Sequence, residues 1–314
     1  MNTFNWLLLR AGEFTLAAWH AIKSVATSVW SVIDTALNPI LSPLLALLNP
    51  LCTRAGDVVY SLLDPFPIWV GLTILSALAG VVMLIGFRYA SNQKAIGRAK
   101  DDIKANLLAL KLYKDDLRVT FGSQARILWG ILRLQRYVLT PVVLLALPML
   151  LTLAQMGVRH QWRPLRAGER TLLRVWSAHP ADVAAAASIE TSPGLIVEVG
   201  PIAGEGDVVW RVRGGDAGRH VLRIKIGDEM FEKEVVVGEG FQRVGAVRPG
   251  SHWTRQLLHP AEPVLESSRD VSGIELMYPG RESWVYGSDY WIVAFFVISM
   301  AAALILKPLF GVRF

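Results

Sequence analysis

Residues 87–118 read FRYASNQKAIGRAKDDIKANLLALKLYKDDLR, and this stretch decides how the chain is organised. Residues 88–136 contain eleven Lys and Arg against four Asp and Glu, so this segment carries +7 while the whole chain carries +6. Uncharged apolar runs border the segment on both sides. Because Lys and Arg next to a membrane span mark its cytoplasmic side, the pattern predicts a cytoplasmic excursion between two transmembrane helices.

Three uncharged runs, of 23, 22 and 17 residues, are long enough to cross a bilayer, which takes about 20 apolar residues with a lower limit near 17. With 53% hydrophobic and only 18% charged residues, the chain is also more apolar and less charged than soluble proteins usually are. We therefore expect an all-α membrane core of three transmembrane helices, at residues 66–88, 137–158 and 287–307.

The charge pattern also predicts the orientation of these helices. A cytoplasmic segment at residues 89–136 places residues 1–65 and 159–286 outside and the tail at residues 308–314 inside. Five arginines between residues 159 and 174 run against this assignment, but the inner segment is more densely basic and long outer segments translocate largely regardless of charge. We expect a multi-pass protein of the plasma (inner) membrane, with its N-terminus outside and its C-terminus in the cytoplasm.

For residues 1–65 the sequence predicts short amphipathic helices. We expect these helices to lie in the outer interface, with Trp6, Trp19 and Trp30 as anchors. The alternative is a fourth span at residues 35–53, which would place the N-terminus inside. Three prolines in that stretch argue against a span, because each proline inside a helix costs about 3 kcal/mol.

The basic segment has the pattern of an antiparallel helical hairpin. Apolar residues recur at intervals of seven, as in a coiled coil, at Ile96, Ile103, Leu110 and Leu117. The motif KDDIK at 100–104 returns as KDDLR two heptads later, and Gly122-Ser123 then offers a turn. Because an apolar stripe must be buried against something, we favour a hairpin over a solvated charged connector.

From about residue 169 to 285 the sequence pattern changes to a period of two. Runs such as VVWRVR and RHVLRIKI are rich in strand-forming residues and are separated by glycine-rich turns. Gly227-Asp228 lies between two such runs, which is a hairpin signal. The spacing predicts that residues 159–286 form an extracytoplasmic all-β domain, an immunoglobulin-like sandwich.

The sequence has no local signature of catalysis, cofactor binding or metal binding. Its six histidines lack metal-ligand spacing, and it has neither a nucleophile elbow nor a phosphate-binding loop. The three uncharged runs leave charged residues only at the ends of the expected spans, whereas pumps and ion-coupled transporters usually carry some within the membrane. We therefore expect no enzyme, no catalytic residues, no cofactor and no metal site, and we disfavour a transporter.

The order of span, basic hairpin, span, outer segment and span resembles the core of the YidC/Oxa/Alb-type membrane protein insertase superfamily. It is similar above all to divergent members, such as the archaeal homologues and the third subunit of the endoplasmic reticulum membrane protein complex. The resemblance rests on residues 87–118 and on RLQRYVLTPVVLLALPMLLTLAQM at 133–156, and it covers somewhat under half of the chain. The chain departs from the family pattern where the β-rich segment replaces a peripheral helical hairpin.

The resemblance implies a hydrophilic groove that opens to the cytoplasm and shortens the path over which a polar segment is desolvated, a cost on the order of several kcal/mol per group. The residues expected to line or flank it are Arg88, Asn92, Gln93, Lys94, Thr140, Gln155 and Ser299. The alternatives are that Arg88 only anchors the end of its helix, and that the Ser and Thr hydroxyls bond carbonyls of their own helices.

We therefore expect a non-enzymatic membrane protein that assists the insertion, folding or assembly of membrane proteins. Its expected partners are membrane lipids, nascent or client membrane proteins, a ribosome at the basic hairpin, and an extracytoplasmic protein at the β domain. The alternative is a membrane-anchored structural or adaptor protein whose outer β domain binds an envelope partner.

Overall fold

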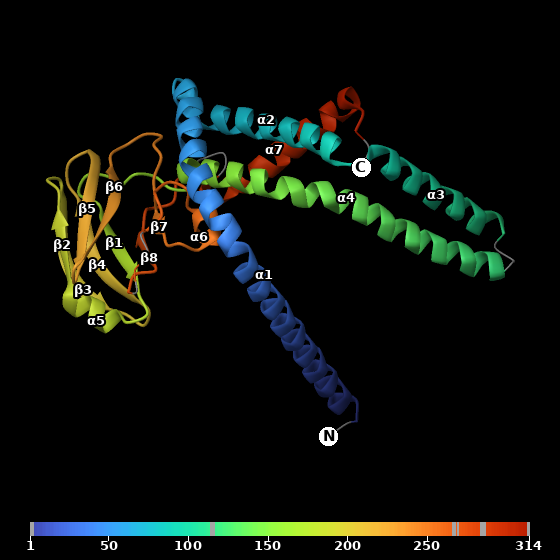
Figure 1. Cartoon of the computed structure of the whole chain (residues 1–314), viewed down its shortest axis with the longest axis horizontal. Coiled ribbons are helices and arrows are strands. Elements are labelled where there is room, and N and C mark those ends of the chain that lie inside the picture. The colour runs from blue at the N-terminus through green and yellow to red at the C-terminus, as the bar shows by residue number, and fades with distance from the viewer. Residues whose placement is uncertain (1–2, 114–116, 266–267, 269, 283–286, 313–314) are drawn as a thin grey trace.

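The computed structural model describes residues 3–113, 117–265, 268, 270–282 and 287–312. It combines long helices with a unit of antiparallel strands at one end of them (Figure 1). At the opposite end, α3 (Gln93–Leu112) and α4 (Leu117–His160) form a helical hairpin. The prediction of apolar helices combined with an inserted antiparallel β region is confirmed at this level.

Helix α1 (Thr3–Leu63) is one continuous helix of 61 residues, so the prediction of short helices over residues 1–65 is wrong. Three prolines lie inside it, at Pro39, Pro43 and Pro50. All three occupy exposed positions, and each removes one backbone hydrogen bond of the helix. The helix persists because its opposite face is held by contacts with distant parts of the chain.

Those contacts form a polar seam along α1, which binds the segment around α6 (Trp253–Leu258). Asn38 Oδ1 accepts a hydrogen bond from the backbone nitrogen of Trp253 at 2.9 Å, and Asp34 Oδ1 accepts one from its indole Nε1 at 2.8 Å. Asn49 Nδ2 donates to the carbonyl oxygen of Gln256 at 2.8 Å. The seam therefore ties α1 to a segment about 200 residues away in the sequence.

The face of α1 away from the seam is an exposed apolar stripe. Its side chains recur at helical spacing, at Ile40, Leu44, Leu47, Leu51, Val58 and Leu62. A helix that buries polar groups and exposes apolar ones is suited to lipid rather than to water, because lipid cannot satisfy polar groups.

Four helices are long and apolar enough to cross a membrane, one more than the three expected. They are Thr27–Leu63, Ile68–Ala90, Thr120–His160 and Tyr290–Phe310. The additional one lies in α1, where the alternative of a fourth span was considered and disfavoured because of the prolines.

Helices α2 (Ile68–Ala90), α4 and α7 (Gly287–Phe310) lie side by side (Figure 1). One hydrophobic cluster joins them next to the β region and includes Leu72, Met156 and Phe295. A second cluster joins them at the base of the hairpin and includes Phe87 and Val312. Because Val312 follows α7, the described C-terminal residues lie at the hairpin end of the helices.

The hairpin brings the expected apolar stripe of α3 against α4. Ile96 is fully buried and Ile103 is half-buried, and a Cβ added at Gly130 of α4 would lie 2.8 Å from Ile103 Cγ1. The turn expected at Gly122-Ser123 is wrong, because both residues lie inside α4. Helix α3 ends at Leu112 and α4 begins at Leu117. Residues 114–116, the second KDD motif, lie outside the described part.

The strands form two antiparallel sheets. The first has the order β3-β4-β1-β8-β7, and the second has the order β2-β5-β6. The strands are β1 (Arg170–Trp176), β2 (Ala187–Thr191), β3 (Leu195–Ala203), β4 (Asp207–Gly214), β5 (Gly218–Ile226), β6 (Glu229–Val237), β7 (Val247–Pro249) and β8 (Gly273–Leu276). The expected hairpin turn at Gly227-Asp228 joins β5 to β6, with Gly227 at a φ of +57°.

The buried faces of both sheets contribute to one hydrophobic cluster. Leu173 and Trp210 come from the five-stranded sheet, and Leu222, Ile224 and Val235 come from the three-stranded sheet. Alternate residues of β1 are buried, as the period of two predicts. The region is not all-β as expected, because the short helices α5 (Pro180–Ala186) and α6 interrupt it.

Candidate functional site

The candidate site is a groove between α2, α4 and α7. Helix α2 packs along α7, whereas α4 meets α7 only over a short contact. At Gly80 of α2 the two helices approach so closely that an added Cβ would overlap the carbonyl oxygen of Ser299. Between the two clusters that join the three helices, an open groove of about 520 Å³ lies among α2, α4 and α7.

The groove is lined almost entirely by apolar side chains. Three of them are methionines, one from each helix: Met83, Met149 and Met300. Ser299 is the single polar side chain in the lining, and its Oγ donates a hydrogen bond to the carbonyl oxygen of Phe296 at 3.2 Å. The lining contains no charged residue among the described ones, so the groove is suited to an apolar occupant.

Four of the seven predicted groove residues lie together where α2 ends and α3 begins. Arg88 is exposed in the last turn of α2. Asn92 Oδ1 caps α3 by accepting a hydrogen bond from the backbone nitrogen of Ala95 at 3.0 Å. Gln93 Nε2 donates to Ser91 Oγ, and Lys94 is exposed. These residues flank the hairpin base rather than line the groove.

The other three predicted residues are far apart. Thr140 is exposed on α4, and its Oγ1 donates to the carbonyl oxygen of Arg136 at 2.9 Å. Gln155 is buried between α4 and α1, where its Nε2 donates to Thr53 Oγ1 at 2.9 Å. Only Ser299 lines the groove. The sequence analysis missed the methionines and Gly80, although a glycine inside an apolar run is a signal of close helix packing.

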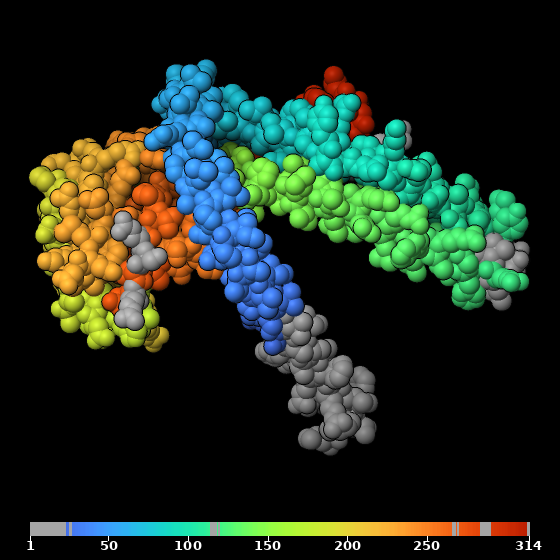
Figure 2. Space-filling view, in the orientation of Figure 1, coloured from blue at the N-terminus to red at the C-terminus, as the bar shows by residue number. Residues whose placement is uncertain are grey.

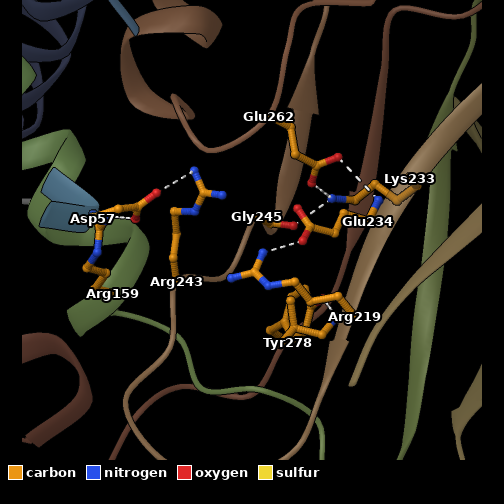
Figure 3. Close-up of polar contacts among 10 residues, drawn as sticks. Asp57, Arg159, Arg219, Lys233, Glu234, Arg243, Gly245, Glu262 and Tyr278 are labelled. Atoms are coloured by element: carbon orange, nitrogen blue, oxygen red, sulfur yellow. Dashed lines mark hydrogen bonds and ion pairs between the residues drawn. The ribbon is translucent and has the colours of Figure 1, made fainter. Parts of the chain in front are cut away.

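Helix α1 crosses the end of α4 beside the two-sheet unit (Figure 2), and polar side chains meet at this junction. Asp57 of α1 binds Arg159 at the end of α4, and it lies 3.7 Å from Arg243 (Figure 3). Tyr60 and His160 are hydrogen-bonded at 3.0 Å between their side chains. Arg159 has only 3% of its side chain exposed, so Asp57 supplies the countercharge that a buried guanidinium needs.

Acidic side chains lie close to most of the five arginines between residues 159 and 174, whose charge argued against the expected orientation. Arg163 makes two hydrogen bonds of 2.8 Å to the carboxylate of Glu169, and these bonds lower the pKa of Glu169. Two further arginines of the group pair with carboxylates on neighbouring strands: Arg170 with Glu198, and Arg174 with Asp207. Four of the five arginines therefore lie within 4.0 Å of a carboxylate, although Arg211 and Arg213 share Glu198 with Arg170.

Two other basic groups have shifted pKa values, and one of them, Arg281, contacts the junction. Burial lowers the pKa of Arg281 to about 10, and its Nε donates to the carbonyl oxygen of Arg159 at 3.1 Å. Burial, together with Lys233 and Arg255, lowers the pKa of His259 to about 4. His259 is therefore neutral at pH 7. Within the described residues, no group of three or more His, Cys, Asp and Glu side chains could hold a metal ion.

No protein-family model matches this sequence, and no curated protein matches it significantly. Among solved structures, the crystal structure of the S-layer protein rSbsC(31-844) is similar over 26% of this chain and 12% of that chain. The sequences are 15% identical over the match, and the TM-score is 0.21. A similarity this low carries no argument about fold or function.

Proposed function

We propose that this chain is an integral membrane protein that holds the apolar helix of a client membrane protein in the groove between α2, α4 and α7. It thereby assists the insertion, folding or assembly of that client. The observation that carries the proposal is the open, apolar groove with one methionine from each helix. Methionine side chains are flexible and polarisable, and they are common on surfaces that bind varied apolar partners.

The apolar lining changes the physical role expected for the groove. A polar groove would reduce the cost of moving polar groups through the bilayer, whereas this one favours close packing of a client helix. Helices associate in lipid mainly through van der Waals packing, because lipid chains are as apolar as leucine. A weakly hydrophobic client helix would gain most from such a surface.

The basic hairpin supports a role for a cytoplasmic partner. Helix α4 has 44 residues and is therefore about 66 Å long, whereas the apolar core of a bilayer is about 30 Å thick. The hairpin consequently stands clear of the membrane in the proposed arrangement. Its lysines and arginines would attract an anionic partner such as a ribosome surface or anionic lipid.

The proposed topology has four spans, with the hairpin and the C-terminus in the cytoplasm and the two-sheet unit outside. We count α1 as a span because its polar seam faces protein while its apolar stripe is exposed. The N-terminus is then cytoplasmic, opposite to the expectation from three spans. In the same proposal the two-sheet unit is a sandwich of the immunoglobulin-like class, since both sheets share one core.

Thiol labelling tests the topology. Cys52 is the one cysteine of the chain, so a Cys52→Ser variant provides a clean background. A cysteine at Ala105 of α3 should react only after the membrane is permeabilised, and one at Asp228 in the β5–β6 turn should react in intact cells. Reaction of the Ala105 site in intact cells would invert the topology and remove the cytoplasmic hairpin from the proposal.

Photocrosslinking during client insertion tests the function. A photoreactive residue at Met83 or Met300 should form adducts with a single-span client of weak hydrophobicity, because these side chains line the groove. The same residue at Leu144 or Ile305, which are exposed outside the groove, should form few. Equal crosslinking from both sets would contradict the proposal.

A matched pair of variants on α7 adds a functional measurement. Ala303 lines the groove, and Ala301 is exposed outside it. Ala303→Leu should fill part of the groove and lower client insertion about fivefold, which corresponds to roughly 1 kcal/mol of lost packing. Ala301→Leu should leave insertion unchanged, and a similar loss in both variants would argue against the groove as the binding surface.

An adaptor role is the second candidate, and one observation favours it. Strand β3 is an edge strand, and its apolar side chains Ile196, Val199 and Ile202 are exposed. A free edge strand can pair with a strand of another protein. Crosslinks from Ile202 to an envelope protein, together with none from the groove, would select the adaptor role.

A further inference from the structure

A second cavity, of about 480 Å³, lies between α1 and the loop at residues 260–264. Its wall on α1 contains Asn49, Arg54 and Asp57, and Arg243 approaches from the loop that follows β6. Figure 3 shows Arg243 pointing toward Asp57 from the side of the two-sheet unit. The cavity is separate from the groove, since the two share no lining residue.

Asn49, which lines the cavity, has a buried acceptor that nothing in the described chain satisfies. Asn49 is 7% exposed, and its Nδ2 donates to the carbonyl oxygen of Gln256. Its Oδ1 is buried and has no hydrogen-bond partner among the described residues. Leaving a buried carbonyl oxygen unpaired is unfavourable, so a ligand that brings a donor to this point would be stabilised.

Two guanidinium groups line the cavity, those of Arg54 and Arg243. The carboxylate of Asp57, which also lines it, is bound to Arg159 outside the lining and lies 3.7 Å from Arg243. Glu262 also lines the cavity, but its carboxylate is bound to the buried Lys233. Arg54 is exposed, and within the described residues it makes no ion pair of 4.0 Å or less. Because both lining carboxylates are bound to cations outside the lining, Arg54 and Arg243 favour an anionic ligand.

The surroundings of the cavity place an apolar surface next to this polar site. Leu47 and Leu51 belong to the exposed apolar stripe of α1, 65% and 56% exposed, and they adjoin the lining residues Ala46 and Pro50. An anion whose apolar tail lies along this stripe would satisfy both features. A glycerophospholipid has this chemistry, with a phosphodiester at the head and acyl chains below it.

We propose that this cavity binds the headgroup of an anionic glycerophospholipid that carries hydroxyl donors, as phosphatidylglycerol does. The phosphodiester lies between Arg54 and Arg243, a headgroup hydroxyl donates to Asn49 Oδ1, and the acyl chains follow the stripe of α1. Arginine suits the first contact because its planar guanidinium donates paired hydrogen bonds to phosphate oxygens.

Lipid binding to the full chain in detergent tests this site, with native mass spectrometry as the readout. The probes are phosphatidylglycerol and phosphatidylmethanol with the same acyl chains, which share the phosphodiester anion but differ in the hydroxyl groups. Phosphatidylglycerol should bind about tenfold more tightly, as one added hydrogen bond in a buried site predicts. Asn49→Leu should abolish that preference. Equal binding of the two lipids to the wild-type chain would overturn the role of Asn49.

Charge removal tests the phosphodiester contact. Arg54→Gln should weaken phosphatidylglycerol binding about tenfold, and Arg54→Gln with Arg243→Gln about a hundredfold, since each removes a charge-assisted contact. The single variant keeps the test usable if the double variant does not fold. The control, Arg211→Gln with Arg223→Gln, removes two exposed arginines of the two-sheet unit and should bind as the wild type does.

Inorganic phosphate and glycerophosphoglycerol separate a lipid from a soluble phosphate. Neither should displace phosphatidylglycerol at equal concentration, because neither has acyl chains for the stripe. Displacement by either would overturn a lipid as the ligand, and unchanged binding in the double arginine variant would overturn the site itself. Neither outcome depends on whether the groove binds a client.

Discussion

Lys233→Met is expected to lower the free energy of unfolding of the two-sheet unit by about 3–5 kcal/mol, because it leaves a buried carboxylate without its partner. The side chain of Lys233 is 0% exposed and that of Glu262 is 5% exposed, and the two are bound to each other (Figure 3). Lys233 Nζ also donates to the carbonyl oxygen of Gly245 at 2.6 Å. Chemical unfolding followed by near-UV circular dichroism measures the loss.

A double variant separates the penalty of an unpaired charge from the value of the pair. Lys233→Met combined with Glu262→Leu should recover most of the stability, since replacing both members of a buried pair by apolar residues is often close to neutral. The control pair is Arg223 and Glu232, each 56% exposed, and breaking it should cost under about 1 kcal/mol. An equal loss in the single and double variants would contradict this account.

Gly80→Leu is expected to separate α2 from α7 and to destabilise the helical core by about 3 kcal/mol, at the upper end of typical overpacking costs. The added Cβ would overlap the backbone carbonyl of Ser299, and a backbone atom cannot move aside without moving its helix. Thermal unfolding in detergent measures the change. The variant should also deform the groove, because this contact holds α2 against α7.

Gly122→Ala, on α4, is expected to leave the stability of the helical core unchanged or to raise it slightly. A Cβ at Gly122 of α4 would meet nothing within 4 Å, and alanine favours a helix over glycine by about 1 kcal/mol. The variant should therefore be as stable as the wild type or slightly more stable. A loss comparable to that of Gly80→Leu would show that glycine content, rather than the contact with Ser299, governs the effect.

The features predicted correctly from the sequence arise from local patterns. The heptad positions Ile96 and Ile103 predict the helical hairpin, and the dipeptide Gly227-Asp228 predicts the turn between β5 and β6. Each requires only the periodicity of a few neighbouring residues. The predicted turn at Gly122-Ser123 was wrong because it also rested on a local signal. Glycine weakens a helix locally, but the packing of α3 on α4 outweighs that cost.

The candidate site stays a prediction. Arg88, Asn92, Gln93 and Lys94 were expected at the groove mouth, and they follow the lining residue Phe87 near the end of α2. Of the three residues expected inside the spans, Ser299 alone lines the groove. Thr140 bonds its own helix and Gln155 faces α1. The direction in which a polar residue points depends on how three helices are rotated about their axes, and that rotation is set by contacts such as the one at Gly80.

The sequence by itself determined the kinds of segment in this protein: the apolar helices, the basic hairpin between two of them, and the antiparallel strands before the last. Tertiary structure alone decided the continuous course of α1, the apolar lining of the groove, and the pairings of Asp57 with Arg159 and of Lys233 with Glu262. The physical reason is distance along the chain. Asp57 and Arg159 are 102 residues apart, so nothing in the neighbourhood of either residue specifies the other.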